Sequence, residues 1–257
     1  MWPFDRIRQR RLLRRHAQPS TEWIQVAYSL PLLDGLSEEE LTTLHRLSVL
    51  FAHNKVLEPT PDVAVDEALV LRITLQACLP ILHLGIDWYD DWTSIIVYPG
   101  EFITRRDALD EAGVYHEWEE VVSGESWQEG PIVFSIADIG ASGKGEGYNV
   151  VIHEMAHKLD MRNGDANGFP PLHPDMQARA WTDAMASAFG QLRSRVERDE
   201  PVSIDPYAAE DPAEFFAVLS EYFFEQPGLV KHEFPAAYAQ LSAFYRQDPA
   251  ERINRHR

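Results

Sequence analysis

Residues 148–160 have the sequence YNVVIHEMAHKLD and contain the pattern H-E-x-x-H between His153 and His157. In a helix these two histidines lie one turn apart on the same face. Two imidazoles at this spacing can hold one zinc ion, and Glu154 beside them is placed to activate a water molecule. The stretch therefore predicts the active helix of a zinc metallopeptidase.

The alternative is a surface helix that carries two solvated histidines. In a chain of 257 residues with 10 histidines, the pattern arises by chance in only about 4 % of sequences. Its neighbours are strongly apolar, which favours a buried helix: Val150, Val151, Ile152, Met155, Ala156 and Leu159. Buried imidazole and carboxylate groups cost free energy unless a partner satisfies them, and a metal ion would do so. The context therefore favours the metal site.

The composition excludes several other classes of protein. Cys78 is the only cysteine, so the chain has neither an internal disulfide nor a cysteine-based zinc site. The net charge of -18 opposes direct nucleic-acid binding, because the phosphate backbone would be repelled. No apolar run approaches the roughly 20 residues that cross a bilayer, and the first residues lack the apolar core of a secretory signal. We therefore expect a cytoplasmic protein without a transmembrane segment.

Residues 1–20 form a basic segment on this acidic protein. They include Arg6, Arg8, Arg10, Arg11, Arg14, Arg15 and His16. The simplest interpretation is a frayed or solvated tail, and the alternatives are a helix on a membrane surface or a contact with an acidic partner. We expect residues 21–257 to form a single zinc metallopeptidase domain.

Helices dominate the predicted elements. Ser37 and Glu40 form a capping box that begins one helix, and Asp66 caps a second one that Pro80 ends. Further helices are predicted over about 174–199, 211–224 and 235–247. Residues 94–99, 114–122 and 131–136 have the composition of strands, and 123–126 that of a turn. Helices and a small sheet that segregate in this way predict the α+β class.

A catalytic zinc site needs a third protein ligand and one open position. The downstream candidates are Asp165, His173, Asp205, Glu210, Asp211, Glu214 and Glu221. Glu214 is preferred because it begins an otherwise apolar helix, where a buried carboxylate needs a cation. The helix dipole also favours an anion there, so an ordinary surface charge is the alternative. Glu221 is the second choice, or an acceptor for a ligand histidine. Asp160 either orients a histidine N–H or caps the helix.

Two long segments resemble the Mlc titration factor A family of bacterial zinc peptidases, whose catalytic core is similar to that of anthrax lethal factor. They are residues 153–165, HEMAHKLDMRNGD, and residues 207–224, YAAEDPAEFFAVLSEYFF. Shorter likenesses occur at 30–33, 78–82 and 126–133, and the resemblance covers about residues 23–250. It implies a zincin-like fold, mostly helical, with a small sheet beside the H-E-x-x-H helix.

The resemblance also implies a role for each site residue. His153, His157 and Glu214 would be the zinc ligands, Glu154 the catalytic base and Tyr207 a catalytic tyrosine near the metal. Glu154 would take a proton from water and pass it to the leaving amine, and Tyr207 would donate to the oxyanion that develops. Without the resemblance, Tyr207 is equally well a packing residue of a loop.

The function implied by the resemblance is zinc-dependent hydrolysis of peptide bonds in a peptide or protein substrate, as an aminopeptidase or a peptidase for short peptides. Members of the family sequester the repressor Mlc, which regulates the glucose phosphotransferase system. The resemblance implies that this chain could bind such a repressor. A second hypothesis is therefore a protein that binds a transcriptional repressor and whose hydrolytic activity is secondary. A zinc hydrolase acting on a non-peptide bond is a third.

In peptidases with this helix, an edge strand pairs with the extended substrate. Residues 131–136 are our candidate for that strand, because a proline such as Pro131 is tolerated at the edge of a sheet.

Overall fold

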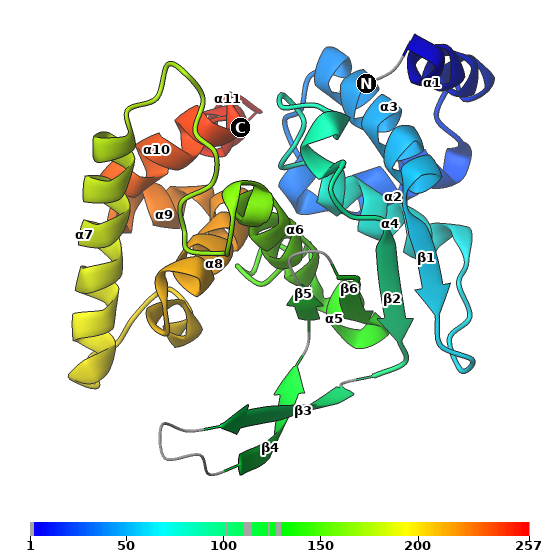
Figure 1. Ribbon diagram of the computed structural model, residues 1–257. Helices are drawn as coiled ribbons and strands as arrows, with labels where there is room; N and C mark the ends of the chain where they lie inside the picture. The colour runs from blue at the N-terminus through cyan, green and yellow to red at the C-terminus, as the bar shows by residue number, and fades with distance from the viewer. Residues whose placement is uncertain (1–2, 101, 110–114, 123, 127–129, 257) are drawn as a thin grey trace.

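The structure, a computed structural model, describes residues 3–100, 102–109, 115–122, 124–126 and 130–256. Helices pack around the larger of two small sheets, and the smaller sheet projects away from them (Figure 1). The H-E-x-x-H helix lies beside the larger sheet, and the α+β, zincin-like class is confirmed. The α-helices are α1 (Pro3–Arg15), α2 (Thr21–Tyr28), α3 (Glu38–Asn54), α4 (Glu67–Cys78), α5 (Ile136–Ala141), α6 (Val150–Asp160), α7 (Ala178–Glu197), α8 (Pro212–Glu225), α9 (Pro227–Glu233), α10 (Pro235–Tyr245) and α11 (Pro249–His256). The strands are β1 (Val56–Pro59), β2 (Ser94–Tyr98), β3 (Phe102–Leu109), β4 (Tyr115–Val122), β5 (Gly124–Ser126) and β6 (Ile132–Ser135).

The predicted helix caps are confirmed. Ser37 accepts a hydrogen bond from the Glu40 backbone N–H, and the Glu40 carboxylate accepts one from the Ser37 backbone N–H, which completes the capping box of α3. The Asp66 side chain caps α4 by accepting from the Leu69 N–H at 2.8 Å. These local patterns fix where both helices begin because they satisfy N–H groups that have no partner inside the helix.

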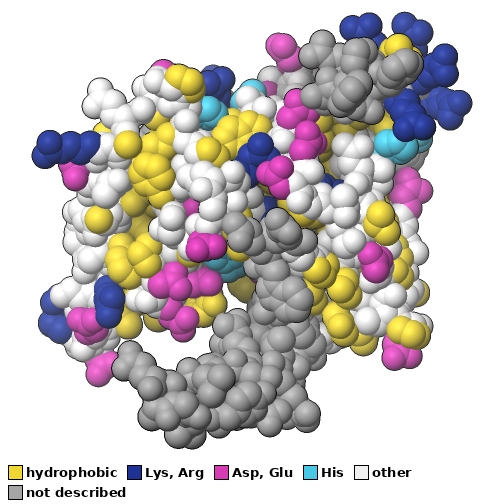
Figure 2. Space-filling model, viewed as in Figure 1, with side chains coloured by type: hydrophobic (Ala, Val, Ile, Leu, Met, Phe, Trp, Pro, Cys, Tyr) yellow, Lys and Arg dark blue, Asp and Glu magenta, His cyan; other side chains and the backbone are white. Residues whose placement is uncertain are grey.

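The basic N-terminal segment is helical along most of its length. α1 covers Pro3–Arg15, and its Leu12 and Leu13 pack against the core. The arginine side chains from Arg8 to Arg15 are exposed, and Figure 2 shows the dark blue side chains that gather over α1. The apolar contact of Leu12 and Leu13 therefore attaches α1 to the core, and the arginine side chains of α1 form a basic surface on an acidic protein.

The larger sheet has the strand order β1-β2-β6-β5. β1, β2 and β6 are parallel, and β5 is antiparallel to β6. β3 and β4 pair in a separate antiparallel ladder. The predicted strands at 94–99, 114–122 and 131–136 correspond to β2, β4 and β6, but β4 lies outside the larger sheet. The turn predicted at 123–126 was wrong for Gly124–Ser126, which form β5; Ser123 lies outside the described residues.

The predicted substrate-binding edge strand was also wrong. β6 pairs with β2 on one side and with β5 on the other, so it lies inside the sheet. Pro131 precedes β6, which begins at Ile132, and it therefore does not mark an edge. The edge on the side of α6 is formed by β5.

α6 occupies the centre of the molecule. Figure 1 shows it between α8 and the sheet, and it packs on both as well as on α4. Its apolar side chains are fully buried: Val151, Ile152, Met155, Ala156 and Leu159. Among the described helices, none is both long and apolar enough to cross a bilayer.

Gly168 holds the end of α6 against the beginning of α8. Its backbone N–H donates to Asp160 Oδ2 at 2.7 Å, and its carbonyl accepts from Trp181 Nε1 of α7 at 3.0 Å. The residue has φ +75°, and a Cβ at this position would lie 2.4 Å from the carbonyl oxygen of Pro212. Only glycine fits both the conformation and the contact.

We expect Gly168→Ala to lower the free energy of unfolding by at least about 2 kcal/mol, because it adds left-handed strain to a backbone overlap. The midpoint of thermal unfolding should fall by at least about 4 °C. Gly190→Ala is the matched control. Gly190 is exposed in α7 with nothing near its Cβ position, so alanine should stabilise the helix by about 0.5–1 kcal/mol. Equal effects of the two substitutions would contradict the role given to Gly168.

Candidate metal centre

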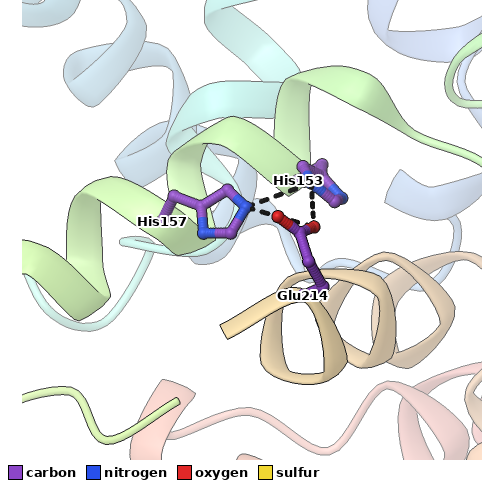
Figure 3. A group of neighbouring side chains, drawn as sticks. All are labelled: His153, His157 and Glu214. Carbon is purple, nitrogen blue, oxygen red and sulfur yellow. Dashed lines mark hydrogen bonds and ion pairs between the residues drawn. The ribbon is translucent and has the colours of Figure 1, made fainter. Parts of the chain in front are cut away.

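Three side chains from two helices converge at one point. His153 and His157 come from α6, and Glu214 reaches them from α8 (Figure 3). The Nε2 atoms of the histidines are 3.1 Å apart. Glu214 Oε2 lies 3.2 Å from Nε2 of His153 and 3.5 Å from Nε2 of His157. Within the described part of the chain, these three residues form the group suited to a metal ion, with all ligand atoms within 4.8 Å of one another.

These distances fit a tetrahedral ion. Metal–ligand bonds of about 2.0–2.1 Å at tetrahedral angles separate the ligand atoms by about 3.3 Å. Two imidazole nitrogens that face each other at 3.1 Å repel unless a cation or a proton lies between them. Glu214 Oε2 is also buried, and it lies against both of these nitrogens. The donor set therefore matches what a metal ion requires.

The electrostatics of the cluster favour a cation. Burial acts to lower the pKa of His153, but its hydrogen bonds to Glu214 and Glu221 hold that pKa well above the usual value. Burial likewise acts to raise the pKa of Glu214, but hydrogen bonds from His153 and His157 hold it far below. Carboxylates that favour a proton on an imidazole also favour a metal ion in its place.

Glu221 orients the first histidine. His153 Nδ1 donates to Glu221 Oε1 at 2.8 Å, which directs the lone pair of His153 Nε2 toward the cluster. The other oxygen of Glu221 accepts from the backbone N–H of Asn149. Burial raises the pKa of Glu221. Glu221 was predicted to be either a metal ligand or a hydrogen-bond acceptor for a histidine. The structure shows the acceptor, because Glu221 is not among the three converging side chains.

A buried amide fixes the beginning of α6. The Asn149 side chain accepts from the Ile152 N–H at 3.0 Å, which caps the helix. Its Nδ2 donates to Gln76 of α4 at 2.8 Å and to Glu225 of α8 at 2.7 Å. Asn149, Gln76 and Glu225 were missed by sequence reasoning, although an asparagine directly before an apolar helix is a typical cap.

Glu154 lies beside the cluster on α6. Its side chain is 2 % exposed, and Oε2 is buried without a hydrogen bond among the described residues. Burial raises the pKa of Glu154, and the nearby histidines act in the opposite direction. A carboxyl group with a raised pKa is well suited to take up a proton and release it again.

Tyr207 lies on the solvent side of the cluster, in the 3₁₀ helix η4 (Pro206–Ala209). The residue is 44 % exposed, and its ring centroid is 6.2 Å from that of His153. The Asp205 side chain caps η4 by accepting from the Tyr207 N–H at 2.9 Å. The structure thus brings all five predicted site residues into one region, four of them at least partly buried and Tyr207 at the surface.

Comparison with known proteins identifies the family. Residues 4–246 match the family described as glucose-regulated metallo-peptidase M90. The chain is 41 % identical over 240 residues to Mlc titration factor A of Escherichia coli O9:H4 (strain HS), covering 93 % of this chain and 90 % of the relative. It is 41 % identical over 239 residues to the Shigella sonnei (strain Ss046) protein of the same name, covering 92 % and 90 %. The chain belongs to the M90 metallo-peptidase family.

Membership of the M90 family implies a metal ion, and the remaining candidate ligands lie outside the converging group. Asp211 caps α8 by accepting from the N–H groups of Ala213 and Glu214. His173 Nε2 donates to the Phe244 carbonyl at 2.8 Å. Asp165, Asp205 and Glu210 are exposed.

Asp160 does not hydrogen-bond to His153 or His157. Its Oδ2 accepts from the backbone N–H groups of Asn167 and Gly168, both at 2.7 Å. Nδ1 of His157 is buried without a hydrogen bond among the described residues. In this M90 family member, Asp160 therefore fixes the connection after α6 and neither orients His157 nor caps the helix by a side-chain hydrogen bond.

We expect the purified protein to bind one zinc ion per chain, measured by competition with a chromophoric chelator. Glu221→Gln should weaken zinc binding by about 10–100-fold, because it removes the acceptor that orients His153. Glu214→Ala should weaken binding further, because it removes a direct ligand. Glu154→Gln is the control, since Glu154 is not one of the three converging ligands. Wild-type zinc affinity in Glu214→Ala would contradict the assignment.

Proposed function

We propose that the protein is a zinc-dependent metallopeptidase with His153, His157 and Glu214 as ligands. The observation that carries this proposal is the convergence of three ligand atoms within 4.8 Å, with the buried carboxylate of Glu154 on the next residue of α6. The M90 family match supports metallopeptidase chemistry, and the tetrahedral spacing of two imidazoles and a carboxylate is typical of zinc. Residues 21–257 form the peptidase domain in this proposal, and the cytoplasm is its location.

The chain supplies two groups for hydrolysis. A zinc ion, when bound, lowers the pKa of water and polarises the scissile carbonyl. Glu154 takes a proton from the attacking water and delivers it to the nitrogen of the leaving amine. Tyr207 donates a hydrogen bond to the carbonyl oxygen as negative charge develops there. The exposed position of the Tyr207 ring near His153 supports this role, because a substrate can reach both.

We propose short peptides as substrates, with removal of N-terminal residues as the favoured reaction. β5 is the edge strand beside α6, and an extended peptide can add to such an edge through backbone hydrogen bonds. We therefore propose β5 (Gly124–Ser126), rather than 131–136, as the strand that holds the substrate.

A second candidate is binding to a transcriptional repressor. The name of the relatives, Mlc titration factor A, describes proteins that titrate Mlc. Repressor binding requires no turnover, so one protein can both bind a repressor and hydrolyse peptides. Binding can also be the main function, with hydrolysis as a secondary activity. The two candidates respond differently to the loss of Glu154.

We expect Glu154→Gln to abolish hydrolysis of a fluorogenic peptide panel while zinc content is unchanged, because the amide cannot accept the proton. Binding of a repressor, if it is the function, should survive this change. Hydrolysis at the wild-type rate in Glu154→Gln would refute the proposed mechanism.

We expect Tyr207→Phe to lower kcat by about 10²–10³-fold with a smaller effect on KM, because a donor to the oxyanion acts mainly in the transition state. Tyr28→Phe, at an 87 % exposed tyrosine of α2, is the control and should leave both constants unchanged. Steady-state kinetics on one peptide substrate would measure both constants. An unchanged kcat in Tyr207→Phe would contradict the catalytic role of Tyr207 and leave it as a packing residue.

A further inference from the structure

A polar cavity of about 600 Å³ lies away from the metal centre. It is bounded by the beginning of α3 and by α11 with the turn that precedes it, and Figure 1 shows α11 facing the N-terminal helices. None of its lining residues belongs to α6 or α8. Its basic side chains are His83, Arg246, Arg252 and Arg255.

Arg252 is the unusual member of this lining. Its side chain is buried, with the residue only 7 % exposed, and Nε is buried without a hydrogen bond among the described residues. Nη2 donates to the Leu32 carbonyl at 2.7 Å. No carboxylate of the described residues lies within 4.0 Å of the guanidinium. A buried cation with no carboxylate in direct contact is costly to a fold, so an anion in the cavity would complete this arrangement.

The backbone positions Arg252 tightly. Gly35 has φ +77°, and a Cβ there would lie 3.0 Å from the Arg252 carbonyl oxygen and 3.1 Å from its Cγ. The absence of a Cβ at Gly35 leaves room for this close approach, and the hydrogen bond to Leu32 holds the guanidinium in place. A rigid, planar donor of this kind suits the recognition of phosphate and carboxylate groups.

Two acidic groups of the lining already have partners. Glu40 Oε2 accepts from the backbone N–H and hydroxyl of Ser37 in the capping box. Asp248 Oδ1 accepts from the Tyr238 hydroxyl at 2.6 Å and from the Glu251 N–H at 2.9 Å. Glu40 Oε1 also lies 3.4 Å from His83 Nε2. The negative charge of Glu40 acts on Arg252 from a distance, without a direct ion pair among the described residues. The third, Glu39, is exposed.

Arg246 and Arg255 add positive charge at the exposed side of the cavity. Arg246 ends α10 in the left-handed conformation with φ 54°. Arg255 lies 3.8 Å from Glu251 in an exposed pair, which contributes little because water screens it. Both side chains are therefore available to a ligand at small energetic cost.

We propose that this cavity binds a small molecule through a compact oxyanion, either a phosphate or a carboxylate. Arg252 contacts the oxyanion at the base, and Arg246 and Arg255 contact it from the exposed side. The volume of about 600 Å³ is in the range of sites for metabolite-sized ligands. The site is separate from peptide hydrolysis, and its occupant lies between the beginning of α3 and α11.

The test is calorimetric titration of the full-length protein with inorganic phosphate and with citrate at constant ionic strength. We expect saturable binding of one anion per chain for at least one of them, and the preferred probe distinguishes a phosphorylated ligand from a carboxylate. Arg246→Ala combined with Arg255→Ala should weaken binding by about tenfold or more. Because both residues are exposed, this variant is expected to fold. Arg252→Met should abolish binding.

Arg193→Ala is the matched control, because Arg193 is an exposed arginine of α7 paired with Glu197. It should bind the probe like the wild type. His153→Ala should also bind it, since the cavity does not include the metal centre. Loss of binding in His153→Ala but not in the arginine variants would place the anion on the metal and overturn the proposal. Absence of saturable binding with both probes would overturn it as well.

Discussion

The site depends on the contact between α6 and α8, where one face of α8 carries acidic side chains into the core. Glu221 and Glu225 are 5 % and 7 % exposed, and burial raises the pKa of each. The burial of these carboxylates is compensated by hydrogen-bond donors at α6. His153 Nδ1 and the backbone N–H of Asn149 donate to Glu221, and the Asn149 side chain donates to Glu225. Since a buried carboxylate without such donors is costly, these hydrogen bonds fix both the rotation and the height of α8 against α6.

That constraint determines where Glu214 lies. It is two turns before Glu221 on the same helix, so the hydrogen bond between Glu221 and His153 places the Glu214 carboxylate beside the two Nε2 atoms. Asp211 already satisfies the backbone N–H of Glu214 at 3.0 Å. The Glu214 side chain therefore does not serve as the cap of α8 and remains directed at the histidines. The geometry of the metal cluster therefore depends directly on the contact between α6 and α8.

The sequence predicted the parts of this arrangement that are local. The H-E-x-x-H spacing and its apolar neighbours identified α6, and the apolar run after Asp211 identified α8 and the burial of Glu214. Glu214 was preferred as the third ligand because a carboxylate inside an apolar helix needs a partner. Glu221 was the second choice, and the full set of ligands was implied by the family resemblance. Asn149 and Glu225 could not be paired in the same way, because a hydrogen bond between residues 76 positions apart leaves no periodic pattern.

The strands, in contrast to these helices, depend on pairing partners that local sequence patterns do not reveal. β5 has only three residues, too few for an alternating pattern, and its Gly and Ser residues are typical of turns. It becomes a strand by pairing with β6, which only the folded chain provides. Whether a strand is at an edge is likewise a property of its neighbours. Pro131 lies one residue before β6, where a missing N–H interrupts no ladder, so the proline was compatible with an interior strand all along.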